Sequence, residues 1–204
     1  MKHYPLLYPG TEVLLPPQLF GSVAYYRLMS RYERARVDTE LRFDKRFKSV
    51  HRFAIVDAPG VQLLTVPVAK PAGECVWNDV KVSDHGKWWL PMPNALATAY
   101  SRTPFFEFYI DRLLPLFSED IVGLPVTELC ARADAIVRGV LCMEDSDGIV
   151  TDTDDYRRRP FDEVLGEPAP YCQLRSGTIG FTGGLSVLDL IFNMGPESCL
   201  YLTE

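Results

Sequence analysis

The sequence predicts an α/β protein: a single domain with a mixed or mostly parallel sheet and flanking helices. Two observations predict this class. The 204 residues match the length of one medium-sized domain. Short runs rich in β-branched and aromatic residues alternate with longer segments whose apolar residues recur every three or four positions. The chain has no internal repeat, low-complexity tract or linker, so we expect residues 1–204 to form one domain.

The N-terminal part has the pattern that opens an α/β unit. Residues 12–15 form an apolar run, which predicts a buried strand, and Pro16 and Pro17 end it. Ser22 is a residue type that favours the N-cap position, and it predicts a helix over about 22–31. The loop between such a strand and helix often holds a ligand.

Turn signals and helical periodicity predict the remaining elements. Thr103 is predicted to cap one of the helices, with Pro104 in the first helical position. In chain order the predicted elements are a strand over 50–56, a turn over 57–60, a strand over 61–68, a loop over 69–79, a short strand near 80–83, helices over 95–102, 105–117 and about 126–141, and a short helix over 186–193 that ends at Gly195.

Residues 144–155 are rich in Asp, which raises the question of a cation site. Their spacing does not fit an EF-hand loop, and no bidentate Glu stands where that loop needs one. We therefore interpret the segment as a solvated loop, which the three arginines at 157–159 would neutralise. Magnesium stays open, but the sequence identifies no metal ligand and no other cofactor.

The overall charge limits the partners. A net charge of −6 and a pI of about 5.1 argue against nucleic acid, because binding to its phosphates needs a basic surface. A local basic pocket for one phosphate-bearing small molecule stays compatible with this total. No apolar run approaches the ~20 residues of a membrane helix, and residues 1–6 lack the apolar run of a signal peptide. We therefore predict a cytoplasmic protein without membrane insertion.

Cysteine and histidine give little support for a metal or redox site. The five cysteines are widely spread and contain no CxxC pair, so we interpret them as reduced thiols. Three histidines leave few ligands for a zinc site.

The densest basic cluster of the chain leads into the strand predicted over 50–56. Arg52 could hold a phosphate or carboxylate through its two-pronged guanidinium, and His51 could act as a general base near neutral pH. Alternation along a strand would place these two side chains on opposite faces. The alternative is a solvated basic stretch that protects an edge strand from pairing. The cluster consists of Arg42, Lys45, Arg46, Lys48, His51 and Arg52.

Two further pairs of polar residues are candidates for binding or catalysis. Gln18 and Ser22 flank the predicted start of the first helix, where N–H groups could bind a phosphate; the alternative is a capped helix without a ligand. Asp189 and Asn193 lie four residues apart on one helix face, so Asp189 could act as a base while Asn193 positions a substrate. The structural alternative is that Asp189 caps the helix or pairs with a buried Arg, and that Asn193 closes the helix before Gly195.

Several stretches, in preserved order, carry a family resemblance. Residues 95–109, ALATAYSRTPFFEFY, are similar to a core of the form A-L-x-x-A-Y-x-x-[ST]-P-[YF]-F, and residues 185–196, LSVLDLIFNMGP, to an ending of the form LSIIDLLFNxG. The same pattern includes LPPQ at 15–18, AYY at 24–26, HR at 51–52 and LLTVPV at 63–68. Through these motifs the chain resembles the WbqC-like protein family from about residue 12 to 202.

The resemblance implies a bacterial protein connected with O-antigen or other surface polysaccharide. For some members it implies transfer of glycine or another acyl group to an amino sugar. It further implies a nucleotide-binding α/β fold related to the nucleotidylyltransferase-like class, such as that of cytidylyltransferases and pantothenate synthetase. Two positions depart from the family pattern: Met92 stands where members commonly carry His, and His51 where they carry Asn.

Two functional hypotheses follow. The first is a transferase that moves an acyl or aminoacyl group onto an amino sugar: Arg52 would hold an anionic group, and His51 or Asp189 would take the proton. Asn193 would position the acceptor. The alternative is a non-catalytic module that binds a sugar nucleotide or a partner protein, which the departure at Met92 favours. The expected ligand is a small molecule such as a nucleotide sugar, and the sequence predicts no oligomeric state.

Overall fold

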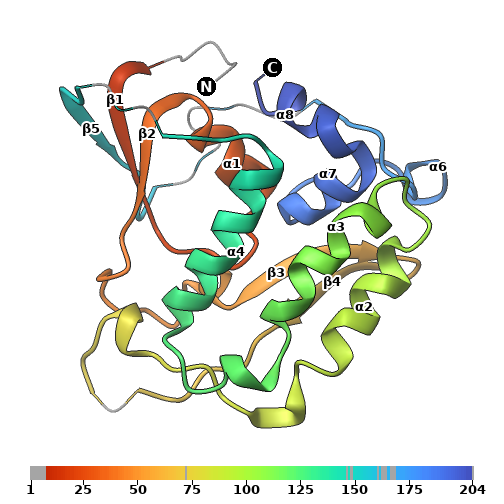
Figure 1. Ribbon diagram of the computed structural model, residues 1–204, viewed down its shortest axis with the longest axis horizontal. Coiled ribbons are helices and arrows are strands. Elements are labelled where there is room, and N and C mark those ends of the chain that lie inside the picture. Colours follow the sequence, from red (N-terminus) through yellow and green to blue (C-terminus); the bar gives the residue numbers. More distant parts are fainter. Residues whose placement is uncertain are drawn as a thin grey trace.

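The first sheet of the protein is parallel and has three strands. The computed structural model describes residues 8–71, 73–145, 147, 149–159, 161, 165 and 169–203. Its strands β1 (Tyr8–Leu15), β2 (Tyr32–Val37) and β5 (Asp152–Asp155) pair in the order β2-β1-β5. Helix α1 (Val23–Met29) connects β1 to β2, so the chain opens with a β-α-β unit (Figure 1).

A hairpin forms the second sheet. Strands β3 (Arg52–Asp57) and β4 (Gly60–Thr65) are antiparallel, and their register runs from Arg52 opposite Thr65 to Asp57 opposite Gly60. Gly60 has a φ of 117°, a conformation that glycine adopts without strain, and this allows the tight turn between the strands.

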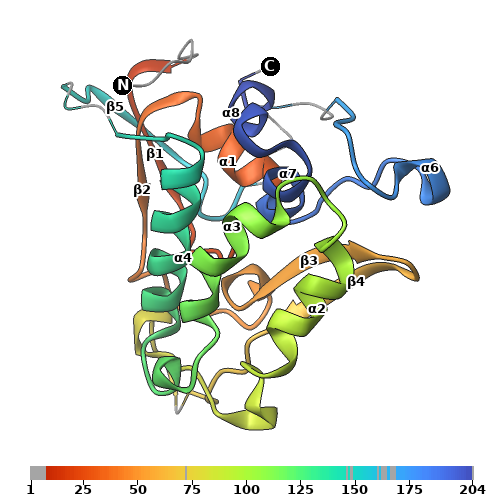
Figure 2. The same ribbon diagram turned by 45° about the vertical axis from the view of Figure 1, so that its right-hand side comes forward.

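Helices cover both sheets (Figures 1 and 2). The long helices are α2 (Pro91–Tyr100) and α3 (Phe106–Leu113) near the hairpin, α4 (Val126–Val140) near α1 and β2, and α7 (Val187–Met194) between the two groups. Short helices α6 (Ser176–Ile179) and α8 (Ser198–Tyr201) flank α7 in the chain. Within the described ranges, no helix has both the length and the apolar character needed to cross a bilayer.

One hydrophobic cluster joins these elements. On α4 the buried residues Val126, Leu129, Cys130, Ala133 and Val137 recur at three-to-four spacing, so one stripe of the helix faces the core. In contrast, α7 is buried on all sides from residue 187 to 193. A helix of that kind lies inside the protein, which explains why α7 contacts α1, α3 and β3.

The predicted fold class is confirmed. The structure is an α/β domain with a parallel sheet and flanking helices. The short strand predicted near 80–83 is wrong, because residues 81 and 82 form only isolated bridges with Pro125 and Val68. The relation to the nucleotidylyltransferase-like fold stays a prediction.

The prediction that residues 144–155 form a loop is wrong for the end of the segment, because its last residues form β5. These residues pair with β1, whose backbone would otherwise be exposed at the sheet edge, and the hydroxyl of Tyr32 donates to the Asp154 carboxylate at 2.8 Å. Strand pairing therefore outweighs the low strand propensity of Asp.

Three local predictions also differ from the structure. Thr103 does not cap α3, because its hydroxyl donates back to the Tyr100 carbonyl at 2.7 Å. The helix predicted over 105–117 ends at Leu113, and a 3₁₀ turn containing Pro115 follows. The strand predicted over 50–56 begins at Arg52, after a 3₁₀ turn over Lys48–Val50.

Gly195 ends α7 as predicted, and it also allows a close approach between helices. Its φ is 53°, in the left-handed region. The Phe105 N–H donates to the Phe192 carbonyl at 3.1 Å, which brings the start of α3 against the end of α7. A Cβ at position 195 would overlap the ring of Phe105.

We expect Gly195→Ala to lower the free energy of unfolding by about 3 kcal/mol, measured by urea denaturation. About 1–2 kcal/mol comes from left-handed backbone and the remainder from overpacking against Phe105. The control is Gly86→Ala, because Gly86 has a φ of 71° and a Cβ there meets nothing within 4 Å. Equal losses in the two variants would contradict the packing argument.

Candidate functional site

The carboxyl ends of the three parallel strands meet at one edge of the sheet. The loops that leave this edge are residues 16–22 after β1, 38–51 after β2 and 156–159 after β5. The Asp38 N–H bonds the Leu15 carbonyl at 2.9 Å, and the Tyr156 N–H bonds the Leu14 carbonyl at 2.8 Å. These two bonds hold the end of β1 between the residues that follow β2 and β5. Open α/β sheets bind ligands outside this edge, so a ligand is expected in a pocket there.

A pocket of about 260 Å³ brings three of the predicted substrate-binding residues together. Gln18 and Ser22 come from the loop between β1 and α1, and Arg52 is the first residue of β3. We call this the carboxyl-edge pocket. Its polar lining residues are Gln18, Ser22, Lys48, Ser49, Arg52 and Ser186. Leu19, Phe20, Phe53 and Leu63 supply an apolar wall.

The pocket offers hydrogen-bond donors and positive charge. Arg52 and Lys48 are its charged groups, and none of the described lining residues is a carboxylate. The Arg52 Nε is buried without a hydrogen-bond partner in the part of the chain that the structure describes. Gln18 accepts from the Ser22 N–H at 3.4 Å through Oε1, which leaves its NH₂ group to donate. Such a set suits an anionic oxygen.

Hydrogen bonds from Ser186 and Val187, in the C-terminal part of the chain, build one wall. The Ser186 N–H donates to the Ala54 carbonyl of β3 at 2.8 Å, and the Ser186 hydroxyl donates to the Phe20 carbonyl at 2.8 Å. The Val187 N–H bonds the Gly21 carbonyl at 2.9 Å. The pocket is thus fixed by segments far apart in sequence.

His51 does not line the carboxyl-edge pocket. It is buried before β3, where its Nδ1 lies 3.0 Å from the Val66 carbonyl and its ring faces Trp77 at a centroid distance of 6.4 Å. Because a carbonyl only accepts, Nδ1 carries the proton and Nε2 keeps its lone pair. Burial lowers the pKa of His51 despite the bond to Val66, so the imidazole is neutral at pH 7.

Asp189 and Asn193 lie together on α7, away from the carboxyl-edge pocket, and both bind the segment that follows residue 170. Asp189 is fully buried and its Oδ2 accepts from the Tyr171 hydroxyl at 2.6 Å and from the Gln173 amide at 2.9 Å. Asn193 accepts from the Leu174 N–H at 2.8 Å and donates to the Asp189 carbonyl at 2.7 Å. The partners of Asp189 are thus a tyrosine and a glutamine and not the predicted buried Arg, and both residues bond within the protein.

Lys48, Ser49 and Ser186 are pocket residues that the sequence reasoning did not assign to a site. Lys48 was visible as part of the basic cluster, but the cluster gave no sign of which members face a pocket. Ser186 was visible only as the start of a helix. Its pairing with Ser22, across the whole length of the chain, has no local sequence signal.

Fold and pocket together define a class: an α/β protein with a cationic pocket at the carboxyl edge of a parallel sheet. The profile of the WbqC-like protein family matches residues 17–141, which is more than half of the chain. The protein therefore belongs to the WbqC-like protein family. The match includes Gln18, Ser22, His51 and Arg52, whereas the resemblance at 185–196 lies beyond it and stays a prediction.

No curated protein gives a significant match to the chain, and no solved structure does.

The buried carboxylate of Asp189 generates a prediction on stability against pH. Burial raises the pKa of Asp189, although hydrogen bonds from Tyr171, Tyr100 and Gln173 oppose the rise. A raised folded pKa means that the folded chain holds the proton more tightly than the unfolded chain. The resulting stabilisation is complete below the unfolded pKa and is lost as pH rises through the folded pKa.

We therefore expect wild type to lose unfolding free energy relative to Asp189→Asn as pH rises from 4 to 8, because Asn stays neutral. Urea denaturation at several pH values measures this difference. The control is Asp111→Asn, which changes an exposed carboxylate on α3. If the wild type and Asp189→Asn curves stay parallel across this range, the carboxyl does not titrate as argued.

Proposed function

We propose that the protein binds an anionic sugar derivative, such as a nucleotide sugar, in the carboxyl-edge pocket. The observation that carries this proposal is that Arg52 and Lys48 both line a pocket whose described lining contains no carboxylate. Two cations without a counter-charge favour an anion, and a guanidinium binds phosphate or carboxylate through two hydrogen bonds.

The shape and lining of the pocket narrow the ligand class. Its volume of about 260 Å³ is below the usual range for whole drug-sized ligands, so a nucleotide sugar would place only its phosphate and sugar end inside. Gln18 and Ser22 would bond sugar hydroxyls, and the apolar wall would cover a ring face. Family membership supports a sugar ligand, through the connection with surface polysaccharide that the sequence resemblance implies.

The second candidate function is acyl or aminoacyl transfer to an amino sugar in bacterial surface-polysaccharide biosynthesis. The sugar amine would attack the acyl carbonyl carbon, lose a proton to a base and release the donor's leaving group. The observation that favours this candidate is the neutral His51, whose Nδ1–H bonds Val66 and whose Nε2 keeps a lone pair. Because His51 does not line the carboxyl-edge pocket, this candidate requires the amine to reach His51 from outside that pocket. Asp189, which was the other candidate base, is fully buried beside Tyr171 and Gln173.

We expect Arg52→Ala to weaken binding of nucleotide sugars at least tenfold, because the variant loses a charge-assisted hydrogen bond of about 1.5–3 kcal/mol. A thermal-shift screen against nucleotide sugars first identifies a ligand for wild type, and calorimetry then compares the variants. Arg52→Lys should retain part of the affinity, since lysine keeps the positive charge but lacks the planar guanidinium that makes two parallel hydrogen bonds.

Arg102→Ala is the matched control, because Arg102 is exposed on the chain after α2 and does not line the pocket. Binding that survives in Arg52→Ala, or that falls equally in Arg102→Ala, would overturn the assignment of the pocket. Failure of every nucleotide sugar to bind wild type would overturn the ligand class.

The transferase candidate is tested by His51→Asn. The Asn side-chain NH₂ can keep the bond to Val66 while the base is lost, so we expect the fold and the ligand affinity to persist. Transfer of a labelled acyl group should fall by about 10²–10⁴-fold. In wild type the activity should hold at pH values below the ordinary histidine pKa, because burial lowers the pKa of His51. Unchanged turnover in His51→Asn would exclude His51 as the base.

A further inference from the structure

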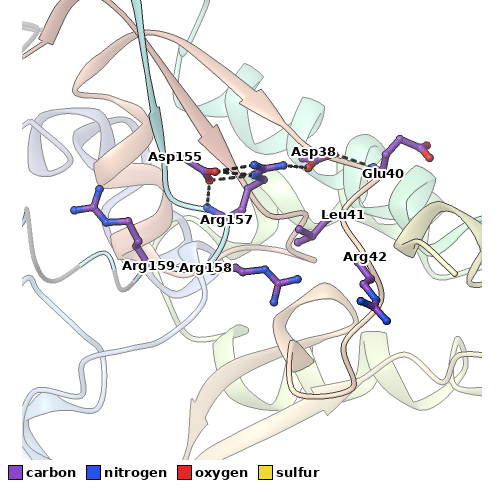
Figure 3. A pocket seen from close by; sticks show the side chains of 8 residues that line it. All are labelled: Asp38, Glu40, Leu41, Arg42, Asp155, Arg157, Arg158 and Arg159. Atoms are coloured by element: carbon purple, nitrogen blue, oxygen red, sulfur yellow. Dashed lines mark hydrogen bonds and ion pairs between the residues drawn. The ribbon is translucent and has the colours of Figure 1, made fainter. Parts of the chain in front are cut away.

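A second and larger pocket lies at the same sheet edge, between the exits of β2 and β5 (Figure 3). Its volume is about 610 Å³, within the range of pockets that hold whole small molecules. Leu41 is a buried part of its lining, and the other lining residues are all charged. Four of them are arginines, so we call it the arginine pocket: Arg42, Arg157, Arg158 and Arg159.

Arg157 neutralises two of the three carboxylates in the lining. Its Nη1 lies 2.7 Å from Asp38 at the end of β2, and its Nη2 lies 2.7 Å from Asp155 at the end of β5. Figure 3 shows this guanidinium between the two carboxylates. The bonds from Arg157 lower the pKa of Asp155, so that carboxylate stays ionised and bonded to Arg157. Arg157 therefore ties two strands together and is not free to bind a ligand.

Arg158 is placed differently. Its guanidinium lies 5.4 Å from the ring centre of Phe47, and it makes no ion pair with a carboxylate in the described part of the chain. A π face holds a guanidinium in position and leaves its N–H groups open at the edge. Figure 3 shows the side chain extending toward the Arg42 side of the pocket.

Arg42 contributes a second available guanidinium. Its partner, Glu74 at 2.6 Å, is 85% exposed and does not line the pocket, so the pair is a weak surface contact that a ligand can displace. The remaining carboxylate of the lining, Glu40, points away from Arg42 and Arg158 in Figure 3. The interior between the two arginines is therefore positive.

We propose that the arginine pocket binds a polyphosphate group, with Arg158 and Arg42 each holding phosphate oxygens. Two guanidinium groups that reach from facing sides suit a ligand with at least two adjacent phosphates better than a single anion. The proposal does not depend on the function proposed for the carboxyl-edge pocket, because Arg42 and Arg158 do not line that pocket.

Inorganic pyrophosphate is the probe, and calorimetry on the full chain measures its dissociation constant in metal-free buffer. We expect Arg158→Ala to weaken binding at least tenfold and Arg158→Lys to weaken it less. Both variants should fold, because Arg158 is exposed; circular dichroism checks this. Raising the salt concentration should weaken binding to wild type and have a smaller effect in Arg158→Ala.

Arg112→Ala is the matched control. Arg112 is also exposed, and its guanidinium also lies over a ring, 5.8 Å from the centre of Tyr109, but it is outside the pocket. Arg112→Ala should bind pyrophosphate as wild type does. Absence of binding to wild type, an Arg158→Ala variant that binds equally well, or an equal loss in Arg112→Ala would overturn the proposal.

Discussion

The hydrogen bonds of Ser186 hold together parts of the chain that are more than 130 residues apart. Its N–H bonds Ala54 in the hairpin, and its hydroxyl bonds Phe20 in the loop after β1, both at 2.8 Å. Its hydroxyl also accepts from the Leu188 N–H at 3.2 Å and so caps α7. One residue, through its backbone N–H and its hydroxyl, thus fixes the hairpin, the first β-α-β unit and the C-terminal helix against each other. The carboxyl-edge pocket lies where the three meet, so its geometry depends on this junction.

The helix that starts at this junction carries a buried polar network on its far side. Asp189 accepts from Tyr171 and Gln173, and Asn193 bonds Leu174, so the irregular segment 171–174 is attached to α7 through side chains. A buried carboxylate is costly unless donors surround it. Here the donors belong to a segment with little regular structure, which explains why these polar residues sit within an otherwise apolar helix. The network satisfies Asn193 and the Oδ2 of Asp189, whereas the buried Oδ1 of Asp189 has no hydrogen-bond partner among the described residues.

The sequence was sufficient for most elements because their signals are local. The apolar stripe on α4, the cap at Ser22 and the stop at Gly195 are each set by a few neighbouring residues. The site was harder, because it depends on contacts between distant segments. Arg52 and His51 are adjacent in sequence, yet the strand begins between them, and only Arg52 reaches the pocket. Strand β5 was missed because partners in space, and not its own Asp-rich composition, decide its pairing.

The distribution of charge explains how an acidic protein can recognise anions. Residues 38–52 and 156–159 contain eight basic and three acidic residues, whereas the whole chain has 21 Lys and Arg against 27 Asp and Glu. The rest of the surface therefore repels an anion, and the carboxyl edge attracts it. At physiological salt the screening length is about 8 Å, so each pocket responds mainly to its own charges. Specific anion binding at this edge then follows from local arginines, and it needs no basic protein as a whole.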